Sequence, residues 1–383
     1  MMKIKDIKTY PLSIDMENPF YYGEGWIKCR SSLIVELITD EGIIGWGEGF
    51  CHGNQPPEPA QAVIERALKP VLIGREIDDV NVLWDEMYYL TQPYGRSGVA
   101  ISAISAIDVA LWDCLGKAAG KPVYKLMGGG YRKDVPAYAS GFFRTPGKKY
   151  PESNVDEALT YISEGYNGMK VKAGFGVDED IRTMLALRKA LGDDVMLMVD
   201  ANCAYNVAEA RRLLKVYEDC SLHWFEEPLA PDDFEGYLEL KNLSSVYIAA
   251  CENEFTKYGF RRWISHRAVD IIQPDLCYAG GFTECSKIVA MAQAWHMQVM
   301  PHAWGSGIGQ AASMQLLAVV PPTPTTFAAS EPMLEYDKSD HPFRNQLVEP
   351  VLKINKDGRV PISDRPGIGV EVNREILERY SRS

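Results

Sequence analysis

The sequence lacks the features of several protein classes. Its eight cysteines are scattered along 383 residues without any C-x-x-C pair, which favours reduced thiols over a disulfide framework. No stretch approaches the run of about 18 apolar residues that a membrane span needs. The first residues alternate like a strand and lack the apolar centre of a signal peptide. We therefore expect a cytoplasmic protein with no membrane partner.

Positive charge is also scarce. The 40 Lys and Arg residues are outnumbered by 52 Asp and Glu residues, and the formal net charge is −12. This balance disfavours binding to nucleic acid or to anionic membrane surfaces. A small anionic ligand would need a locally positive site, made by lysines or by a metal ion.

The residue pattern changes once along the chain. Up to about residue 130, two strands within 31–49 precede a long helix over 97–120 that ends at a glycine, which is an α+β arrangement. From residue 135, short apolar strands, the last over 326–331, alternate with amphipathic helical segments. This alternation predicts an α/β fold with a barrel of parallel strands.

Three parts are expected from these changes, because the chain is longer than one compact core usually needs. They are an α+β domain over residues 1–130, a barrel over 131–341, and a loop-rich C-terminal segment over 342–383 that packs back on the first domain.

Most of the predicted barrel strands end in an acid, a base or an amide. Successive positions lie 23 to 29 residues apart, which is one βα unit. The C-terminal ends of neighbouring parallel strands meet at one mouth of a barrel, where barrel active sites lie. The strand-end residues are Lys172, Asp200, Asn202, Glu226, Glu227, Glu252, Asp275, His302 and Glu331.

Three of these acids predict a metal site. Asp200, Glu226 and Glu252 follow three adjacent strands, and clustered carboxylates repel one another unless a cation lies between them. A set of oxygen ligands without His or Cys favours Mg²⁺ over zinc. Each acid alone would also fit a solvated strand end.

His302 and Asp275 follow neighbouring predicted strands. Taken alone, His302 would more often be a structural histidine. An Asp275 carboxylate that accepts the imidazole N–H would fix the tautomer and raise the basicity of the other nitrogen. The pair is therefore a candidate general base or acid.

Lys170 and Lys172 lie two apart in the segment KVK and share one face of the predicted strand. On this segment alone, a half-exposed strand with a wet lysine face is the simpler interpretation. At a barrel mouth beside a cation, however, Lys172 would have a lowered pKa and supply a neutral amine as a base. Lys170, one layer deeper, would hold a substrate oxygen. A Schiff-base aldolase would also use a barrel lysine, but it needs no acidic triad.

Together, these motifs resemble the enolase superfamily, in its mandelate racemase subgroup. The matching segments are KVK at 170–172, DAN at 200–202, EEP at 226–228, EN at 252–253, QPD at 273–275 and PHAWGSG at 301–307, with GWGE at 45–48 and PGIGVEVN at 366–373 outside the barrel. The resemblance implies a modified TIM barrel, (β/α)7β, under an α+β capping domain that the C-terminal segment completes. It also implies one Mg²⁺ per chain.

The resemblance further implies abstraction of the proton α to a carboxylate, through an enediolate. The acidic triad would bind Mg²⁺, Lys172 would be the base on one face of the substrate, and the His302–Asp275 dyad would act on the other. Lys170 would neutralise the substrate carboxylate.

A glutamate on the last strand would also contact the substrate carboxylate. We prefer Glu331, which ends the apolar FAAS segment, and keep Glu335 as the alternative.

The expected outcome of this chemistry is β-elimination from a small anionic sugar acid or its lactone, as in acid-sugar dehydratases and cycloisomerases. The alternative is a racemase or epimerase of a 2-hydroxy or amino acid, which uses both bases. A barrel kept only as a scaffold or binding protein is a remote alternative, because no expected ligand or base is missing.

Loops from the first domain are expected to cover the barrel mouth and choose the substrate. The substrate-binding candidates are Tyr21, Tyr22, Trp26, His52, Arg144 and Asn202. We also expect a homo-oligomer.

Overall fold

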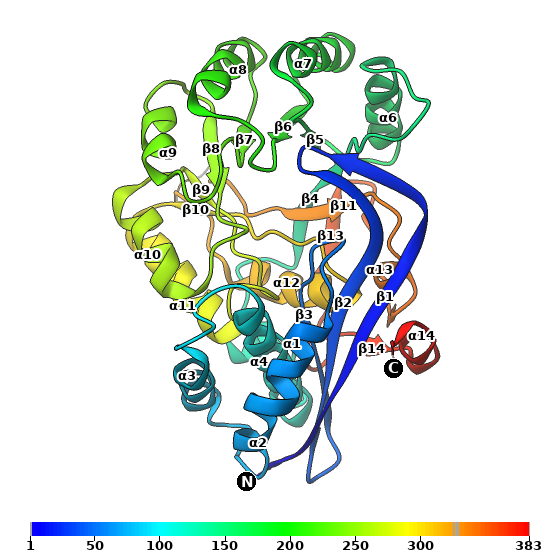
Figure 1. Ribbon diagram of the computed structural model, residues 1–383, viewed down its shortest axis with the longest axis vertical. Helices are drawn as coiled ribbons and strands as arrows, with labels where there is room; N and C mark the ends of the chain where they lie inside the picture. The colour runs from blue at the N-terminus through cyan, green and yellow to red at the C-terminus, as the bar shows by residue number, and fades with distance from the viewer. Residues whose placement is uncertain (1, 325, 327–328, 383) are drawn as a thin grey trace.

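The computed structural model describes residues 2–324, 326 and 329–382, and places an α+β unit against a barrel of parallel strands (Figure 1). In the α+β unit, β1 (Ile4–Tyr22), β2 (Gly25–Thr39) and β3 (Ile44–Gly49) form an antiparallel sheet in that order. Its helical part consists of α1 (Glu58–Val63), a π-helical turn η1 (Ile64–Leu68), α2 (Lys69–Leu72), α3 (Val80–Thr91), α4 (Val99–Ala118) and α5 (Val123–Leu126). We call β1–β3 with these helices the capping domain.

Strand β3 packs unusually close to α4. Glycines alternate along it, and a Cβ added at Gly45 or Gly47 would come within 2.1 or 1.9 Å of backbone oxygens of α4. Side chains alternate across a strand, so Trp46 and Glu48 project from the other face. Helix α4 is long and apolar enough to span a membrane by composition, but 83% of its most apolar window is buried inside the protein.

The barrel contains eight parallel strands in the order β10-β9-β8-β7-β6-β5-β4-β11. The strands are β4 (Asp134–Gly141), β5 (Gly168–Lys172), β6 (Met196–Asp200), β7 (Trp224–Glu226), β8 (Tyr247–Ala250), β9 (Ile271–Ile272), β10 (Gln298–Val299) and β11 (Leu334–Asp337). Between them lie α6 (Glu152–Ser163), α7 (Val177–Leu191), α8 (Val207–Asp219), α9 (Phe234–Lys241), α10 (Thr256–His266), α11 (Gly281–Ala294) and α12 (Gly307–Val319). This order confirms the predicted (β/α)7β fold with a capping domain.

The last barrel strand differs from the prediction. It was expected over 326–331, but β11 begins at Leu334 and pairs in parallel register with β4; residues 327 and 328 lie outside the described residues. In β11, Glu335 and Asp337 are buried although they are charged. An apolar run therefore indicated the wrong segment, because the true strand carries its acids inward.

The C-terminal segment contains α13 (Pro342–Asn345), β12 (Val348–Glu349), β13 (Arg359–Pro361), β14 (Glu371–Val372) and α14 (Arg374–Tyr380). Strand β13 pairs antiparallel with β4 of the barrel, and the Arg382 N–H donates to Pro11 O on β1 at 2.9 Å. The segment thus contacts both the barrel and the capping domain.

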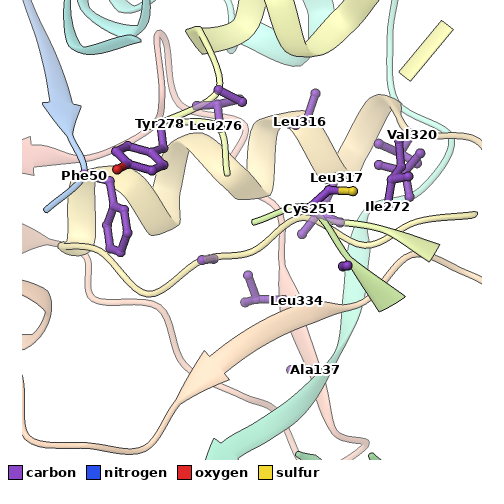
Figure 2. Packing of buried hydrophobic residues seen from close by; sticks show 14 of the residues in the cluster. Phe50, Ala137, Cys251, Ile272, Leu276, Tyr278, Leu316, Leu317, Val320 and Leu334 are labelled. Carbon is purple, nitrogen blue, oxygen red and sulfur yellow. The ribbon is translucent and has the colours of Figure 1, made fainter. Parts of the chain in front are cut away.

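The buried apolar residues continue across the junction between these parts. Phe50, just beyond β3, packs on Tyr278, which follows barrel strand β9, with the ring centroids 5.6 Å apart at 84° (Figure 2). Further along the same cluster lie Leu276 and Leu316 from the barrel. The capping domain therefore shares a core with the barrel at the side where β9 and β10 end.

Candidate active site

Strand β5 places both lysines inside the barrel. Lys170 is fully buried and Lys172 is 8% exposed, while Met169 and Val171 between them join the core around the barrel. The Lys170 ammonium contacts Glu226 and lies 2.8 Å from Glu335 Oε1. The Lys172 Nζ lies 2.5 Å from Asp200 Oδ2 and donates to Asn202 Oδ1 at 3.0 Å. The two lysines therefore share a face and both lie near Asp200 Oδ2, at 3.7 Å for Lys170 and 2.5 Å for Lys172, but their other partners differ.

The acidic triad assembles at the ends of three neighbouring strands. Asp200, Glu226 and Glu252 are buried and offer carboxylate oxygens that lie within 4.8 Å of one another. Glu252 Oε2 is buried and has no hydrogen-bond partner among the described residues, and burial raises the pKa of Glu252 to about 7. Hard oxygen donors with an unsatisfied member fit a divalent cation such as Mg²⁺.

The carboxylates of Asp200 and Glu226 are also held by neutral donors. Asp200 Oδ1 accepts from the Asn202 N–H at 2.9 Å, and Glu226 Oε2 accepts from Trp224 Nε1 at 2.9 Å and Gln273 Nε2 at 2.7 Å. Such outer contacts fix the orientation of carboxylate ligands.

His302 and Asp275 form the expected contact. His302 Nδ1 lies 2.6 Å from Asp275 Oδ2, and Asp275 Oδ1 accepts from the Cys277 N–H at 2.7 Å. The other imidazole nitrogen, Nε2, faces the triad and lies 3.8 Å from Glu252 Oε2. Burial lowers the pKa of His302, but Glu252 and Asp275 outweigh it and raise the pKa to about 10. The His302 ring thus lies next to the triad, where neighbouring carboxylates favour its protonated form.

The charge on Lys172 depends on Asp200. Burial lowers the pKa of Lys172, whereas the negative charge of the adjacent Asp200 raises it. The net result is a pKa above the ordinary value of a lysine. The sequence-based expectation of a lowered pKa assumed a cation beside the lysine. A cation on Asp200 would remove the influence that raises the pKa.

The structure places Glu335, and not the preferred Glu331, on the last barrel strand beside the cavity. Glu331 is half-exposed and pairs with Arg359 Nη2 at 2.7 Å. Glu335 is buried at the mouth, where Oε1 accepts from Ser140 Oγ at 2.8 Å and Oε2 accepts from the Ala303 N–H at 3.2 Å. Lys170, His302 and Lys172 together hold the pKa of Glu335 well below its usual range despite burial.

A cavity lies above these groups, and its empty space, which includes open solvent at its mouth, is about 330 Å³. It is lined by Tyr22, His52, Phe143, Lys172, Asn202, Glu252, His302, Trp304 and Glu335. Of the predicted substrate-binding residues, Tyr22, His52 and Asn202 therefore line it.

The other three predicted loop residues pack on one another or on the protein instead. The Tyr21 and Trp26 rings pack at a tilt of 45° with their centroids 4.8 Å apart, and Arg144 lies over the rings of Tyr150 and Phe175 at 3.7 and 4.2 Å. Tyr21 and Arg144 also exchange two backbone hydrogen bonds of 2.9 Å. These residues seat the β1–β2 hairpin on the barrel beside the cavity.

Trp304 lines the cavity but was not among the sequence candidates. Its ring packs beside Phe20 and Phe143 and lies 4.2 Å from the Arg30 guanidinium carbon. Its indole Nε1 is buried without a hydrogen-bond partner in the described part of the chain. The only sequence signal was its position two residues after His302.

Comparison with known proteins gives the family. The model of the mandelate racemase/muconate lactonizing enzyme N-terminal domain matches residues 7–128, and that of the enolase C-terminal domain-like family matches residues 154–376. D-galactarolactone cycloisomerase of Agrobacterium fabrum is 37% identical over 380 residues, which cover 99% of both proteins.

Two solved structures are similar over the whole chain. The 3,6-anhydro-D-galactonate cycloisomerase of Zobellia galactanivorans is 36% identical, with a TM-score of 0.88 and 100% of both chains covered. A mutant L-talarate/galactarate dehydratase liganded with Mg and L-glucarate is 28% identical, with a TM-score of 0.87, and the match covers 100% of this chain and 92% of that one. This chain therefore belongs to the mandelate racemase/muconate lactonizing enzyme family and is an enzyme of the enolase superfamily, of the lyase or isomerase type.

Proposed function

We propose that the protein removes the proton α to the carboxylate of a sugar acid or its lactone and then expels the β-oxygen, as an acid-sugar dehydratase or cycloisomerase. The observation that carries this proposal is that two nitrogen bases, Lys172 and His302, line one cavity with Glu252 of the acidic triad. The names of the similar cycloisomerases and of the dehydratase with bound L-glucarate support the substrate class.

We infer that Asp200, Glu226 and Glu252 hold Mg²⁺, in agreement with the magnesium of the similar dehydratase structure. When bound, this cation would neutralise the triad, lower the pKa of Lys172, and balance the charge that develops on the substrate carboxylate.

Side chains of the protein carry out the two proton transfers. Lys172 Nζ takes the α-proton as the C–H bond breaks, and His302 Nε2 donates its proton to the β-oxygen as the C–O bond breaks. Lys170, fully buried beside Glu335, supplies a fixed positive charge beneath the cavity. Such fixed charges stabilise negative charge most in a dry site. Asp275 holds the His302 ring and keeps Nδ1 protonated.

A racemase or epimerase is the second candidate, because the same pair of bases would serve it. After Lys172 removes the proton, His302 would return one from the opposite face. The two outcomes start from the same intermediate and differ only in whether a β-oxygen departs.

A substrate panel separates these candidates. The protein with Mg²⁺ in D₂O is incubated with hexaric acids, aldonic acids and their lactones, and the products are followed by NMR. A 2-keto-3-deoxy acid supports elimination. Deuterium at Cα with inversion and without keto acid supports the epimerase and overturns elimination. The cytoplasmic location and the homo-oligomeric state predicted from the sequence remain part of the proposal.

A further inference from the structure

Glu48 is a carboxylate of the capping domain that is buried against the barrel. It lies on β3, between glycines that pack on α4, and is 0% exposed. It accepts from Ser32 Oγ on β2 at 2.6 Å. Within the described residues, the other hydrogen bonds of its carboxylate cross to the barrel, to residues that follow β10.

The barrel contacts of Glu48 are all donors. Ser306 donates through its backbone N–H at 2.9 Å and its hydroxyl at 2.6 Å, and the Gly309 N–H donates at 2.8 Å. These groups belong to the N-cap and first turn of α12, whose unpaired N–H groups favour a carboxylate. Glu48 therefore fixes the beginning of α12 to the capping sheet.

Glycines make this approach possible. A Cβ on Gly305 would lie 2.8 Å from Glu48 Oε1, and a Cβ on Gly309 would lie 2.6 Å from Glu48 Oε2. The GWGE segment at 45–48 and the WGSGIG segment at 304–309 thus form one contact. The first provides the carboxylate, and the glycines of the second leave room for it.

The segment fixed in this way carries two cavity residues, His302 and Trp304. The Ala303 N–H between them donates to Glu335 Oε2 at 3.2 Å, so the segment is held from the barrel side at 303 and from the capping side at 306. Phe50, two residues after Glu48, also packs on the His302 ring with the centroids 5.4 Å apart. One end of β3 therefore contacts the His302 segment twice.

We propose that Glu48 is a positioning residue that ties the capping domain to residues 302–306 and so sets His302 and Trp304 toward the substrate. Glu48 does not line the cavity and touches no reacting atom. Its effect on turnover rests on the proposed function, whereas its effect on the order of residues 302–309 does not.

The test compares Glu48→Gln with Asp113→Asn. Asp113 is an equally buried carboxylate of the capping domain, but it accepts from the Trp46 and Ile368 N–H groups and from Lys117 and lies on the far side of β3 from Ser306. Both variants are expected to unfold at a lower temperature. Glu48→Gln alone should lower kcat, by about 10-fold or more, and should slow deuterium exchange from the His302 face of the substrate more than exchange from the Lys172 face.

A second variant, Gly309→Ala, protects the test against misfolding of Glu48→Gln. Alanine favours the helix, so any loss would come from the added Cβ, which would lie 2.6 Å from Glu48 Oε2 and 3.2 Å from Cys277 Sγ. Gly309→Ala should change the ratio of the two exchange rates in the same direction as Glu48→Gln. An equal slowing of both faces, matching that of Asp113→Asn, would overturn the positioning role.

Amide hydrogen exchange of the ligand-free proteins gives a readout without substrate. Peptides covering residues 302–310 should exchange faster in Glu48→Gln than in wild type and Asp113→Asn. Unchanged exchange in these peptides would also overturn the inference. A wild-type protein that is inactive on every acid would instead overturn the proposed function, while this comparison would still decide whether Glu48 fixes the segment.

Discussion

Glu335 Oε1 lies 2.8 Å from Lys170 Nζ, and both side chains are buried at the mouth of the barrel. Glu335 lines the cavity, whereas Lys170 lies beneath it. The carboxylate is also held by Ser140 and by the Ala303 N–H. Glu335 thus fixes the charged floor of the cavity in place and connects it to the His302 segment.

Replacement of Glu335 by glutamine should reduce kcat/KM by about 100-fold, because a neutral amide cannot form an ion pair with Lys170 and presents donors to a donor-rich site. The matched control is Glu331→Gln, which breaks only the half-exposed ion pair with Arg359 and should leave kcat/KM within about 2-fold. Steady-state kinetics on an accepted sugar acid measure both. Equal losses in the two variants would contradict the placement of Glu335.

Replacement of Lys170 by methionine should weaken proton exchange from both faces of the substrate, by about 100-fold or more, since the fixed charge stabilises either direction of proton transfer. Deuterium incorporation at Cα, followed by NMR in D₂O, measures it. A loss confined to one face would show instead that Lys170 acts as a base.

Metal binding should depend on Glu252 but not on its neighbour in space Glu227. Glu252 belongs to the triad, and its Oε2 has no hydrogen-bond partner within the described residues, whereas Glu227 accepts from Cys203 Sγ and Asn253 Nδ2. Treatment with EDTA should abolish turnover, and added Mg²⁺ should restore it. By calorimetry, Glu252→Gln should bind Mg²⁺ at least about 10-fold more weakly, with Glu227→Gln much closer to wild type. Equal Mg²⁺ affinity of Glu252→Gln and wild type would remove Glu252 from the metal site.

Asp108 on α4 should make stability depend on pH. Burial raises its pKa to about 7, although the Thr283 N–H lowers it. The folded state therefore binds this proton more tightly than the unfolded chain, whose carboxyl has a pKa of about 3.9. The free energy of unfolding contributed by this group falls as pH rises from about 4 to about 7 and then levels off.

The variant Asp108→Asn lacks this titration. Its free energy of unfolding, compared with that of wild type, should therefore rise by up to about 3 kcal/mol when the pH is changed from 5 to 8. Urea unfolding at the two pH values measures the difference. A pH-independent difference for Asp108→Asn would contradict the raised pKa.

The sequence was sufficient for the parts of the site that follow from strand periodicity. Asp200, Glu226 and Glu252 could be grouped because the ends of parallel neighbours converge, and the same argument paired His302 with Asp275. Glu335 was placed second because the charged inward positions of β11 resemble a loop, whereas the FAAS run resembles a buried strand.

Contacts between distant segments were beyond the reach of the pattern. Trp304 becomes part of the cavity wall through Phe20 and Arg30 of the capping domain. Tyr21 and Arg144 attach the β1–β2 hairpin to the barrel through their two backbone hydrogen bonds. Such roles depend on where the capping domain rests, and nothing in the local sequence gives that position.

The central claim is that Lys172 and His302 lie on opposite faces of the bound substrate, so that each can exchange a proton at Cα from its own side. It is tested most directly by deuterium exchange at Cα for an accepted sugar acid and its C2 epimer, in Lys172→Met and in His302→Asn. We predict that Lys172→Met loses exchange with one epimer and keeps it with the other, and that His302→Asn shows the reverse. Exchange that is lost equally for both epimers in each variant, or retained by both variants, would contradict the account.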